Sequence, residues 1–159
     1  MDENAKKALL RFVPYGLYVI GVGRGDEANA FTASWLMQVS MQPPVIALGI
    51  RENSESLRRA RAGGGLTVNY FGKAAHDTLL FFIKPVKDER HRLLEVPFHP
   101  AANGAPVLEG ALGHLECEIR QVVDGFGDHA LLIAEVTGAA LNSEAPPLVM
   151  SDTPWHYGG

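Results

Sequence analysis

The feature that most constrains the fold of this 159-residue chain is a stretch of strict alternation in its last third. In HLECEIRQVV (His114–Val123), apolar and charged side chains take turns: Leu115, Cys117 and Ile119 on one face, Glu116, Glu118 and Arg120 on the other. Such alternation is typical of a half-buried antiparallel strand. A second apolar stretch, FGDHALLIAEVTGAAL, follows across the turn at Asp124–Asp128. The two segments predict a long β-hairpin.

The rest of the chain shows short apolar segments separated by turn residues. Strands are predicted at residues 17–23, 31–35, 45–50 and 66–71, with residues 24–29 as the turn of a first hairpin. Between 35 and 45 the chain is expected to turn through Ser40 to a double proline, Pro43-Pro44. Helices are predicted at residues 2–12, 57–62, 73–84 and 87–95, and a loop at 96–106; Asn53–Ser56 offers candidate N-caps for the second helix.

Many short strands and few helices favour a closed antiparallel β architecture over βαβ units. The length suits one domain, and no internal repeat, low-complexity tract or linker divides residues 1–159. The prediction is therefore a single, mainly β domain.

Composition narrows the classes of partner and compartment. Hydrophobic residues make up 47% and charged residues 20% of the chain, and the net charge is −4, so no basic surface argues for nucleic acid. No apolar run approaches the ~20 residues that span a bilayer. The N-terminus lacks the pattern of a signal peptide, and the single Cys117 excludes an internal disulfide. These features predict a cytoplasmic protein that does not act at a membrane.

Several catalytic or metal motifs are missing from the sequence. GVGRG (Gly21–Gly25) resembles part of a dinucleotide fingerprint, but a turn and a strand follow it where a helix is required, which favours a hairpin turn. The six histidines form no H-x-x-x-H or H-x-E pair, so no metal site is predicted. There is no G-x-S-x-G elbow, and Cys117 on its apolar face is expected to be a buried packing residue.

The segment Ala30–Ile50 has the chemistry of a ligand site. It places the hydroxyls of Thr32 and Ser34 beside Trp35 and continues through Ser40 to the double proline. Hydroxyls and backbone N–H groups near a large aromatic side chain suit a planar, phosphorylated ligand, which needs apolar cover for its ring and donors for its tail. Hydroxyl-rich strands also occur in proteins that bind nothing, so residue chemistry alone leaves both interpretations open.

Three other segments have both a functional and a structural interpretation. Lys73 and the N–H groups of the helix start that follows Asn69–Phe71 suit a phosphate, or Lys73 is an ordinary solvated lysine. Gly127-Asp128-His129 is either a ligand contact or a hairpin cap. The C-terminal DTPWHYGG carries two large aromatic side chains, and we expect it to lie across the body or a partner subunit.

The pattern T-x-S-W-x-x-x-x-S-x-x-P-P, from Thr32 to Pro44, resembles the flavin-binding strand and turn of the flavin reductase-like family. Three further blocks continue the likeness in the same order: Leu66–Pro85, Gly104–Ile119 and Gly127–Val136. The resemblance implies an FMN-binding split β-barrel of Greek-key type with peripheral α-helices. It also implies a homodimer with FMN near the subunit interface.

By the same resemblance, the chain is expected to catalyse NAD(P)H-dependent flavin reduction, with FMN as the flavin and FAD possible. The expected ring and ribityl contacts are Thr32, Ala33, Ser34, Trp35, Val39 and Ser40. The expected contacts to the flavin tail are Asn69, Tyr70, Phe71 and Lys73, and His129 is expected beside the nicotinamide. Two alternatives stay open: an FMN electron carrier served by a protein partner, and a binding protein that has lost the flavin. The choice between NADH and NADPH, and the final electron acceptor, stay open too.

Overall fold

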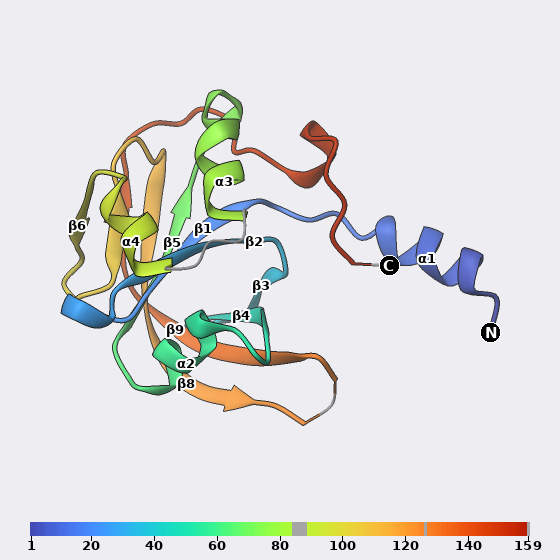
Figure 1. Cartoon of the computed structure of the whole chain (residues 1–159), viewed down its shortest axis with the longest axis horizontal. Helices are drawn as coiled ribbons and strands as arrows, with labels where there is room; N and C mark the ends of the chain where they lie inside the picture. Colours follow the sequence, from blue (N-terminus) through green and yellow to red (C-terminus); the bar gives the residue numbers. More distant parts are fainter. Residues whose placement is uncertain (84–88, 126, 159) are drawn as a thin grey trace.

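The computed structural model describes residues 1–83, 89–125 and 127–158 and shows a mainly β protein with helices at its periphery (Figure 1). One sheet holds seven antiparallel strands in the order β2-β1-β5-β8-β9-β4-β3. Its strands are β1 (Tyr18–Val22), β2 (Asn29–Ala33), β3 (Leu36–Met41), β4 (Pro44–Arg51), β5 (Gly65–Tyr70), β8 (Gly113–Val123) and β9 (His129–Leu141). A two-stranded sheet pairs β6 (Phe98–Pro100) with β7 (Pro106–Leu108). The α-helices are α1 (Glu3–Arg11), α2 (Glu55–Arg61), α3 (His76–Ile83) and α4 (Glu89–Leu94).

The two edge strands of the large sheet, β2 and β3, are consecutive in sequence. Only Ser34 and Trp35 separate them, so the sheet must curl until its opposite edges meet at this link, because each residue spans at most ~3.6 Å. The backbone N–H of Gly49 donates to the carbonyl of Trp35 over 2.8 Å and ties the link to β4. No ladder joins β2 to β3 in the described part of the chain. The structure therefore supports a curled, mainly β antiparallel sheet, without the closed barrel that was expected.

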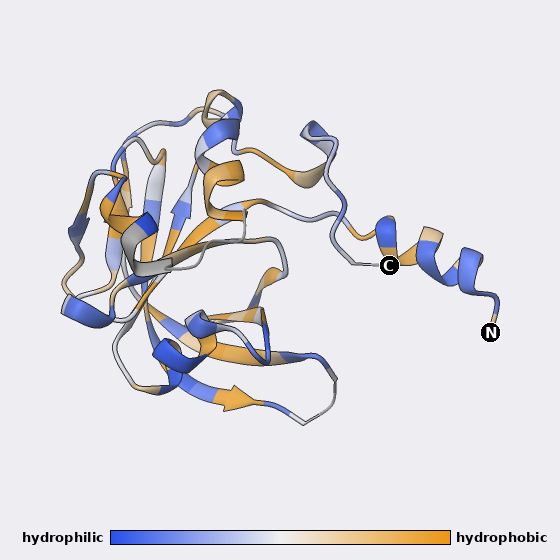
Figure 2. Ribbon diagram, viewed as in Figure 1, coloured by the Kyte–Doolittle hydropathy of each residue, from blue (hydrophilic) through white to orange (hydrophobic). Residues whose placement is uncertain are grey.

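Two apolar cores lie on opposite sides of the sheet. Strand β1 contributes to both: Ile20 and Val22 pack inside the curl, whereas Val19 packs with α3 outside it. The apolar residues of β1 and β4 appear as orange segments of the sheet in Figure 2. A strand buried on both faces has no alternating pattern, which explains the continuous apolar run that predicted β1.

Most predicted elements are confirmed, and two regions differ. The β1–β2 and β8–β9 hairpins form, and Ser54 caps α2 by accepting from the N–H of Leu57. Residues 36–41, expected to turn, form strand β3, whose apolar Met37, Val39 and Met41 are all exposed. The predicted loop at 96–106 contains β6 and the start of β7, strands of three residues each with proline in both. The helix predicted at 87–95 is described from residue 89 onward.

Asn69 on β5 is a polar crosslink inside the molecule. Its side chain is fully buried. Its amide nitrogen donates to the carbonyl of Val19 over 3.0 Å, and its amide oxygen accepts from the N–H of Leu108 over 3.0 Å. Thr67 reinforces the junction by donating from Oγ1 to the carbonyl of Pro106 over 2.5 Å. Asn69 therefore joins β1, β5 and β7.

Helix α1 stands away from the body (Figure 1). Asp2 caps it by accepting from the N–H groups of Asn4 and Ala5, and none of its residues is buried. Nearby apolar side chains are exposed, including Leu9 and Phe12. In the described ranges, no helix combines the length and the apolar character that crossing a membrane demands.

Helix α2 is stabilised by charge, and this predicts a pH dependence. The guanidinium of Arg58, with help from Arg59, holds the pKa of the Glu55 carboxyl at about 2, below its usual 4.5. A carboxyl whose pKa is lowered in the folded state stabilises the fold at pH values above its unfolded-state pKa, and this stability is lost as the pH falls toward 2.

Glu55→Gln should therefore lower the free energy of unfolding by up to about 1 kcal/mol at pH 7, as the loss of an exposed ion pair does. The difference from wild type in urea denaturation should vanish near pH 2; a constant difference would contradict the assignment.

Candidate functional site

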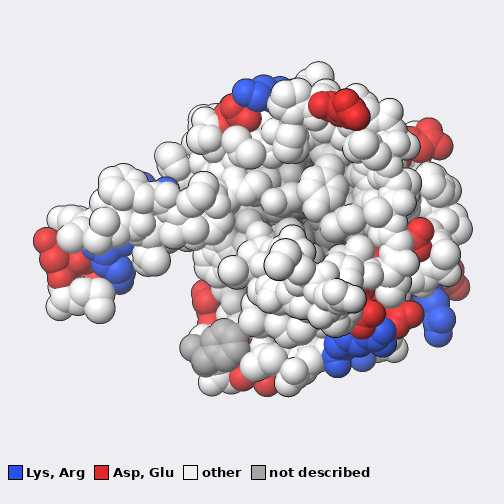
Figure 3. All heavy atoms as spheres, turned by 180° about the vertical axis from the view of Figure 1, so that it is seen from behind, with Lys and Arg blue, Asp and Glu red and all other residues white. Residues whose placement is uncertain are grey.

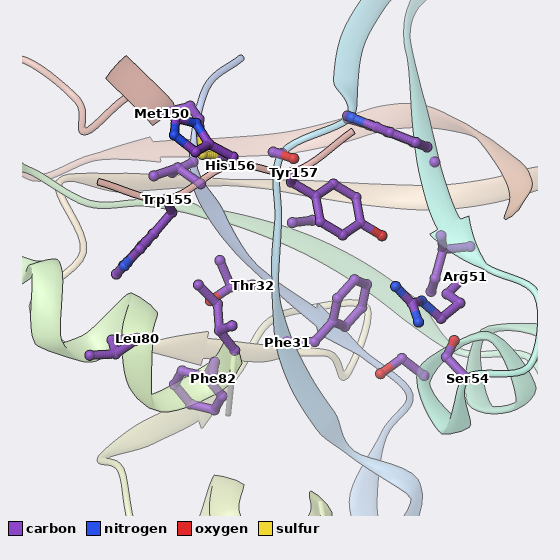
Figure 4. Close-up of a pocket in the computed structure, with 18 of the residues that line it drawn as sticks. Phe31, Thr32, Arg51, Ser54, Leu80, Phe82, Met150, Trp155, His156 and Tyr157 are labelled. Carbon is purple, nitrogen blue, oxygen red and sulfur yellow. The ribbon is translucent and has the colours of Figure 1, made fainter. Parts of the chain in front are cut away.

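A cavity of about 650 Å³ surrounds the free edge of β2 (Figure 4). Pockets for small molecules and cofactors typically measure about 300–1,000 Å³. The lining comes from β2 and the link after it, the end of β4, α3, α4 and the C-terminal tail: Leu17, Phe31, Thr32, Ala33, Ser34, Trp35, Gly49, Ile50, Arg51, Ser54, Ser56, Leu80, Phe82, Ile83, Arg92, Met150, Trp155, His156 and Tyr157. An edge strand leaves alternate N–H and C=O groups without a strand partner. The cavity therefore combines apolar walls with a row of backbone donors and acceptors.

Trp35 is the central aromatic side chain of the site. It lies against Gly49 of β4, where an added Cβ would come within 3.2 Å of the Trp35 side chain. The centroid of its ring lies 4.5 Å from that of His129 and 6.5 Å from that of Tyr15. Its indole Nε1 is buried and has no hydrogen-bond partner among the described residues. A buried, unsatisfied donor in a cavity wall is costly unless a ligand accepts from it.

His129 at the start of β9 is held at both ring nitrogens. Nδ1 lies 2.8 Å from Oδ1 of Asp128, and Nε2 lies 2.7 Å from the hydroxyl of Tyr157. The hydrogen bond from His129 lowers the pKa of Asp128 below its usual value. With Asp128 accepting at Nδ1, a neutral imidazole presents Nε2 as an acceptor.

Arg51 and Ser54 provide polar groups at one end of the cavity. Arg51 ends β4 and is the ladder partner of His129, so the two side chains leave the same face of the sheet. Figure 4 shows Arg51 and Ser54 close together on the side away from α3. Ser54 Oγ already accepts from the N–H of Leu57, which leaves its hydroxyl proton to donate. A guanidinium and a hydroxyl together suit a phosphate.

The opposite end is apolar and includes one buried cation. Leu80 and Phe82 of α3 form the wall, and Thr32 donates from Oγ1 to the carbonyl of Leu79 over 2.8 Å, which fixes β2 to α3. The guanidinium of Arg92 is 5% exposed and lies 5.5 Å from the centre of the Phe82 ring. The hydroxyl of Thr32 is thus used to assemble the wall.

The C-terminal tail crosses the opening, as expected for a segment that lies across the body. The backbone N–H of Met150 donates to the carbonyl of Tyr15 over 2.9 Å. Beyond it, the ring of Trp155 stacks on His76 at 4.5 Å, and the ring of Tyr157 lies 5.1 Å from that of Trp35. In Figure 4 the tail residues form one boundary of the cavity, facing Leu80 and Phe82.

The structure brings together only part of the predicted site. Thr32, Ala33, Ser34 and Trp35 line the cavity, and His129 touches Trp35. The other predicted residues are absent from the lining: Val39, Ser40, Asn69, Tyr70, Phe71, Lys73 and His129 itself.

Burial and pairing explain where these other residues lie. Asn69 and Phe71 are buried in the body, at 0% and 1% exposure, and Val39 is exposed on β3. Tyr70 lines a second hollow of about 450 Å³, beside His114. Lys73 is exposed, and its Nζ donates to Oδ1 of Asp152 over 2.6 Å. The residues from Asn69 to Lys73 therefore lie outside this cavity.

The sequence interpretation did not assign Arg51, Ser54 or Arg92 to the site, and Tyr157 entered only as part of the tail expected to lie across the body. Ser54 was recognised only as a helix cap, a role that it does fill. Arg51 directly follows the strand VIALGI. A cation at the end of a strand, close to a serine that caps the next helix, is the sequence feature that could have identified both residues as part of the site. Nothing in the local sequence pattern links Arg51 or Ser54 to His129. Arg51 comes to lie opposite His129 only through the pairing of β4 with β9.

Other reactive groups lie outside this site. Cys117 is buried as expected, and burial raises the pKa of its thiol to about 12. Within the described ranges, no group of three or more His, Cys, Asp or Glu side chains is arranged to hold a metal ion. On the face shown in Figure 3, the middle is hollowed and largely free of charged side chains, which lie toward the rim.

Comparisons with known proteins agree with this architecture. The chain is 28% identical over 138 residues to diflavin flavoprotein A 1 of Synechocystis, covering 86% of this chain but 24% of that protein. It therefore spans about a quarter of the length of the diflavin flavoproteins that it matches. It is 29% identical over 149 residues to the reductase component of Thermus thermophilus 4-hydroxyphenylacetate 3-monooxygenase, covering 94% of this chain and 91% of that protein.

A solved structure and a family model extend the match. The NADH:FAD oxidoreductase SgcE6 of Streptomyces globisporus, solved with NAD and FAD fragments, superposes with a TM-score of 0.80 and 26% identity, over 93% of this chain and 87% of that one. The model of the flavin reductase like domain matches residues 10–158. The chain belongs to the flavin reductase like domain family.

Proposed function

We propose that the protein is an NAD(P)H-dependent flavin reductase that binds FMN in the cavity beside β2. The observation that carries this proposal is a cavity lined by Trp35 and Arg51, with His129 against the Trp35 ring and opposite Arg51 in the β4–β9 ladder. The lining offers an aromatic surface and a cation, and a hydrogen-bonding imidazole lies beside both. These are the groups that two stacked rings and a phosphate require.

The residues present fit a flavin. Phe31 and Trp35 offer apolar cover for a flat ring, and the buried Nε1 of Trp35 offers a donor without a partner among the described residues. The free edge of β2 supplies backbone donors and acceptors for the polar edge of the ring. Arg51 and Ser54 are the groups that would hold the phosphate. Bound FMN supplies the hydride acceptor, and FAD is the alternative flavin.

The protein contributes binding and alignment to this reaction. Transfer of a hydride between two stacked rings needs no acid or base from the chain, so rate depends on ring geometry and on exclusion of water. In this proposal Trp35 and the apolar wall around Phe82 exclude water, and His129 orients the nicotinamide. The choice between NADH and NADPH depends on contacts to the adenosine part of the nucleotide. We also propose a homodimer, in keeping with the commonest oligomer symmetry.

A second candidate is an FMN electron carrier that receives electrons from a protein partner. This candidate is favoured because the segment that matches this chain makes up only about a quarter of the diflavin flavoproteins, which are longer proteins. Absorption bands of flavin in the purified protein, together with rapid bleaching by NADH or NADPH, support the reductase. Flavin bands without bleaching by either nucleotide support the carrier, and no flavin bands after FMN addition contradict both.

The role proposed for His129 can be tested directly. His129→Ala should slow the bleaching of bound flavin by NAD(P)H roughly tenfold, because an orienting contact acts through donor–acceptor geometry. Affinity for FMN should stay nearly unchanged. Stopped-flow absorbance measures the first quantity and fluorescence titration with FMN the second. An unaltered bleaching rate, or a rate defect explained entirely by lost FMN, would return His129 to a structural role in the hairpin.

A further inference from the structure

The tail residue Tyr157 occupies the contacts that a second aromatic ring would need at this site. Its ring lies 5.1 Å from the ring of Trp35, tilted by 59°. Its hydroxyl lies 2.7 Å from Nε2 of His129. When the imidazole is neutral and Nδ1 donates to Asp128, Nε2 accepts from the hydroxyl of Tyr157. The side chain of Tyr157 therefore occupies both the place beside the Trp35 ring and the hydrogen-bonding position at Nε2 of His129.

The tail is firmly anchored only upstream of this contact. Leu148 is buried, its N–H donates to the carbonyl of Phe71 over 2.7 Å, and its carbonyl accepts from the N–H of Leu17 over 3.2 Å. In the described part of the tail, no backbone–backbone hydrogen bond ties residues 156–158 to the body. Tyr157 itself is 39% exposed. The end of the tail is thus held by side-chain contacts that a ligand can replace.

Gly158 shows how closely the tail approaches the indole. Its φ is +87°, and an added Cβ would lie 3.1 Å from Cζ2 of Trp35. Both the backbone conformation and the space at this position therefore favour glycine. The short approach places the backbone of the tail, as well as the ring of Tyr157, over Trp35.

We propose that Tyr157 is an internal competitor that sets the affinity for the nicotinamide nucleotide. A nicotinamide is a flat ring that carries a carboxamide donor. Its ring can replace the phenol ring beside Trp35, and its carboxamide can replace the hydroxyl at Nε2 of His129. The nucleotide binds at Trp35 and His129 only when Tyr157 has moved away. The inference rests on the proposed function, because it assumes that a nicotinamide docks there.

The competition predicts a specific kinetic pattern. If the site is open about one tenth of the time, removing the competitor raises nucleotide affinity about tenfold. Tyr157→Ala should therefore lower the KM for NAD(P)H about tenfold and leave the bleaching rate at saturation unchanged. Tyr157→Phe keeps the ring and loses the hydroxyl, and should give an intermediate decrease. Ser151→Ala, an exposed tail position outside the cavity lining, is the matched control.

A second measurement tests the cover without any nucleotide. Trp35 and Trp155 are the two tryptophans of the chain, so Trp155→Phe leaves Trp35 as the sole indole. Acrylamide should quench Trp35 more strongly when Tyr157→Ala is added to this background. Gly158→Ala retains Tyr157 but pushes the tail from the indole, and should increase quenching in the same way.

The outcomes separate the inference from the proposed function. Unchanged quenching in both tail variants, or a higher KM in Tyr157→Ala, would overturn the inference, since Tyr157 would then fail to cover the site or would assist binding. A lower rate at saturation would equally overturn it. If quenching rises but neither NAD⁺ nor NADP⁺ binds any variant in titration, the nicotinamide does not dock at this site. That result would contradict both the docking and the competition by Tyr157, whereas the conclusion that the tail covers Trp35 would hold.

Discussion

Replacing Arg51 by alanine is expected to weaken FMN binding about tenfold to a hundredfold, because a charge-assisted phosphate contact contributes about 1.5–3 kcal/mol. Riboflavin has no phosphate, so its affinity should hardly change. Arg51 lies at the end of β4 with its side chain in the cavity lining, beside Ser54. Fluorescence titration of the protein with FMN and with riboflavin measures both affinities.

Lys73→Ala is the matched control for this experiment. Lys73 is the cation that the family resemblance implied for the phosphate, but it is 64% exposed and paired with Asp152, outside the cavity. The proposed site predicts little effect of Lys73→Ala on FMN affinity. A selective loss of FMN over riboflavin in Lys73→Ala, with none in Arg51→Ala, would move the phosphate to the start of α3. Equal losses for both ligands in Arg51→Ala would show that Arg51 acts on the ring or the fold.

The largest effect on stability is expected from Asn69→Ala. Its amide joins Val19 and Leu108 across three strands, and the change leaves buried backbone groups without partners. Each unpaired buried group costs about 1–3 kcal/mol, so the free energy of unfolding should fall by about 3–4 kcal/mol. The melting temperature should fall by roughly 10 °C for a chain of this size. Urea denaturation gives the first quantity and calorimetry the second.

Asn142→Ala is a suitable control, because Asn142 is exposed and its Nδ2 makes one hydrogen bond, to the carbonyl of Ala111. That change should cost about 1 kcal/mol or less. If Asn69→Ala were as stable as wild type but bound FMN poorly, Asn69 would be a flavin contact, as the family resemblance implied. A large loss of stability, with affinity for FMN retained in the folded fraction, supports the structural role.

The link between β2 and β3 explains why the site lies where it does. Ser34 and Trp35 join strands at opposite edges of the sheet, so the curl of the sheet brings β4 and β9 to the same place. The Trp35 ring then rests on Gly49 and beside His129. A larger residue at 49 would push the indole into the cavity. The site is therefore a consequence of how the sheet closes on itself.

The local elements of the fold follow from patterns among neighbouring residues. Alternation in residues 114–123 predicted β8, the double-sided apolar run predicted β1, and Asn53–Ser56 predicted the cap of α2. Hydroxyls beside a large aromatic residue also drew attention to the segment around Thr32–Trp35, which lines the cavity. Periodicity succeeds here because each of these features depends on neighbours a few residues away.

Which residues meet from distant parts of the chain depends instead on how the strands and the tail pack. Arg51 lies beside His129 through the β4–β9 register, and Tyr157 reaches His129 by the path of the tail. In the same structure Asn69 points inward and bonds with β1 and β7, whereas the family resemblance implied a contact to the flavin tail. A periodic pattern shows which side chains share one face of a strand. It does not show which face curls inward, because that depends on strand order and on contacts between residues far apart in the chain.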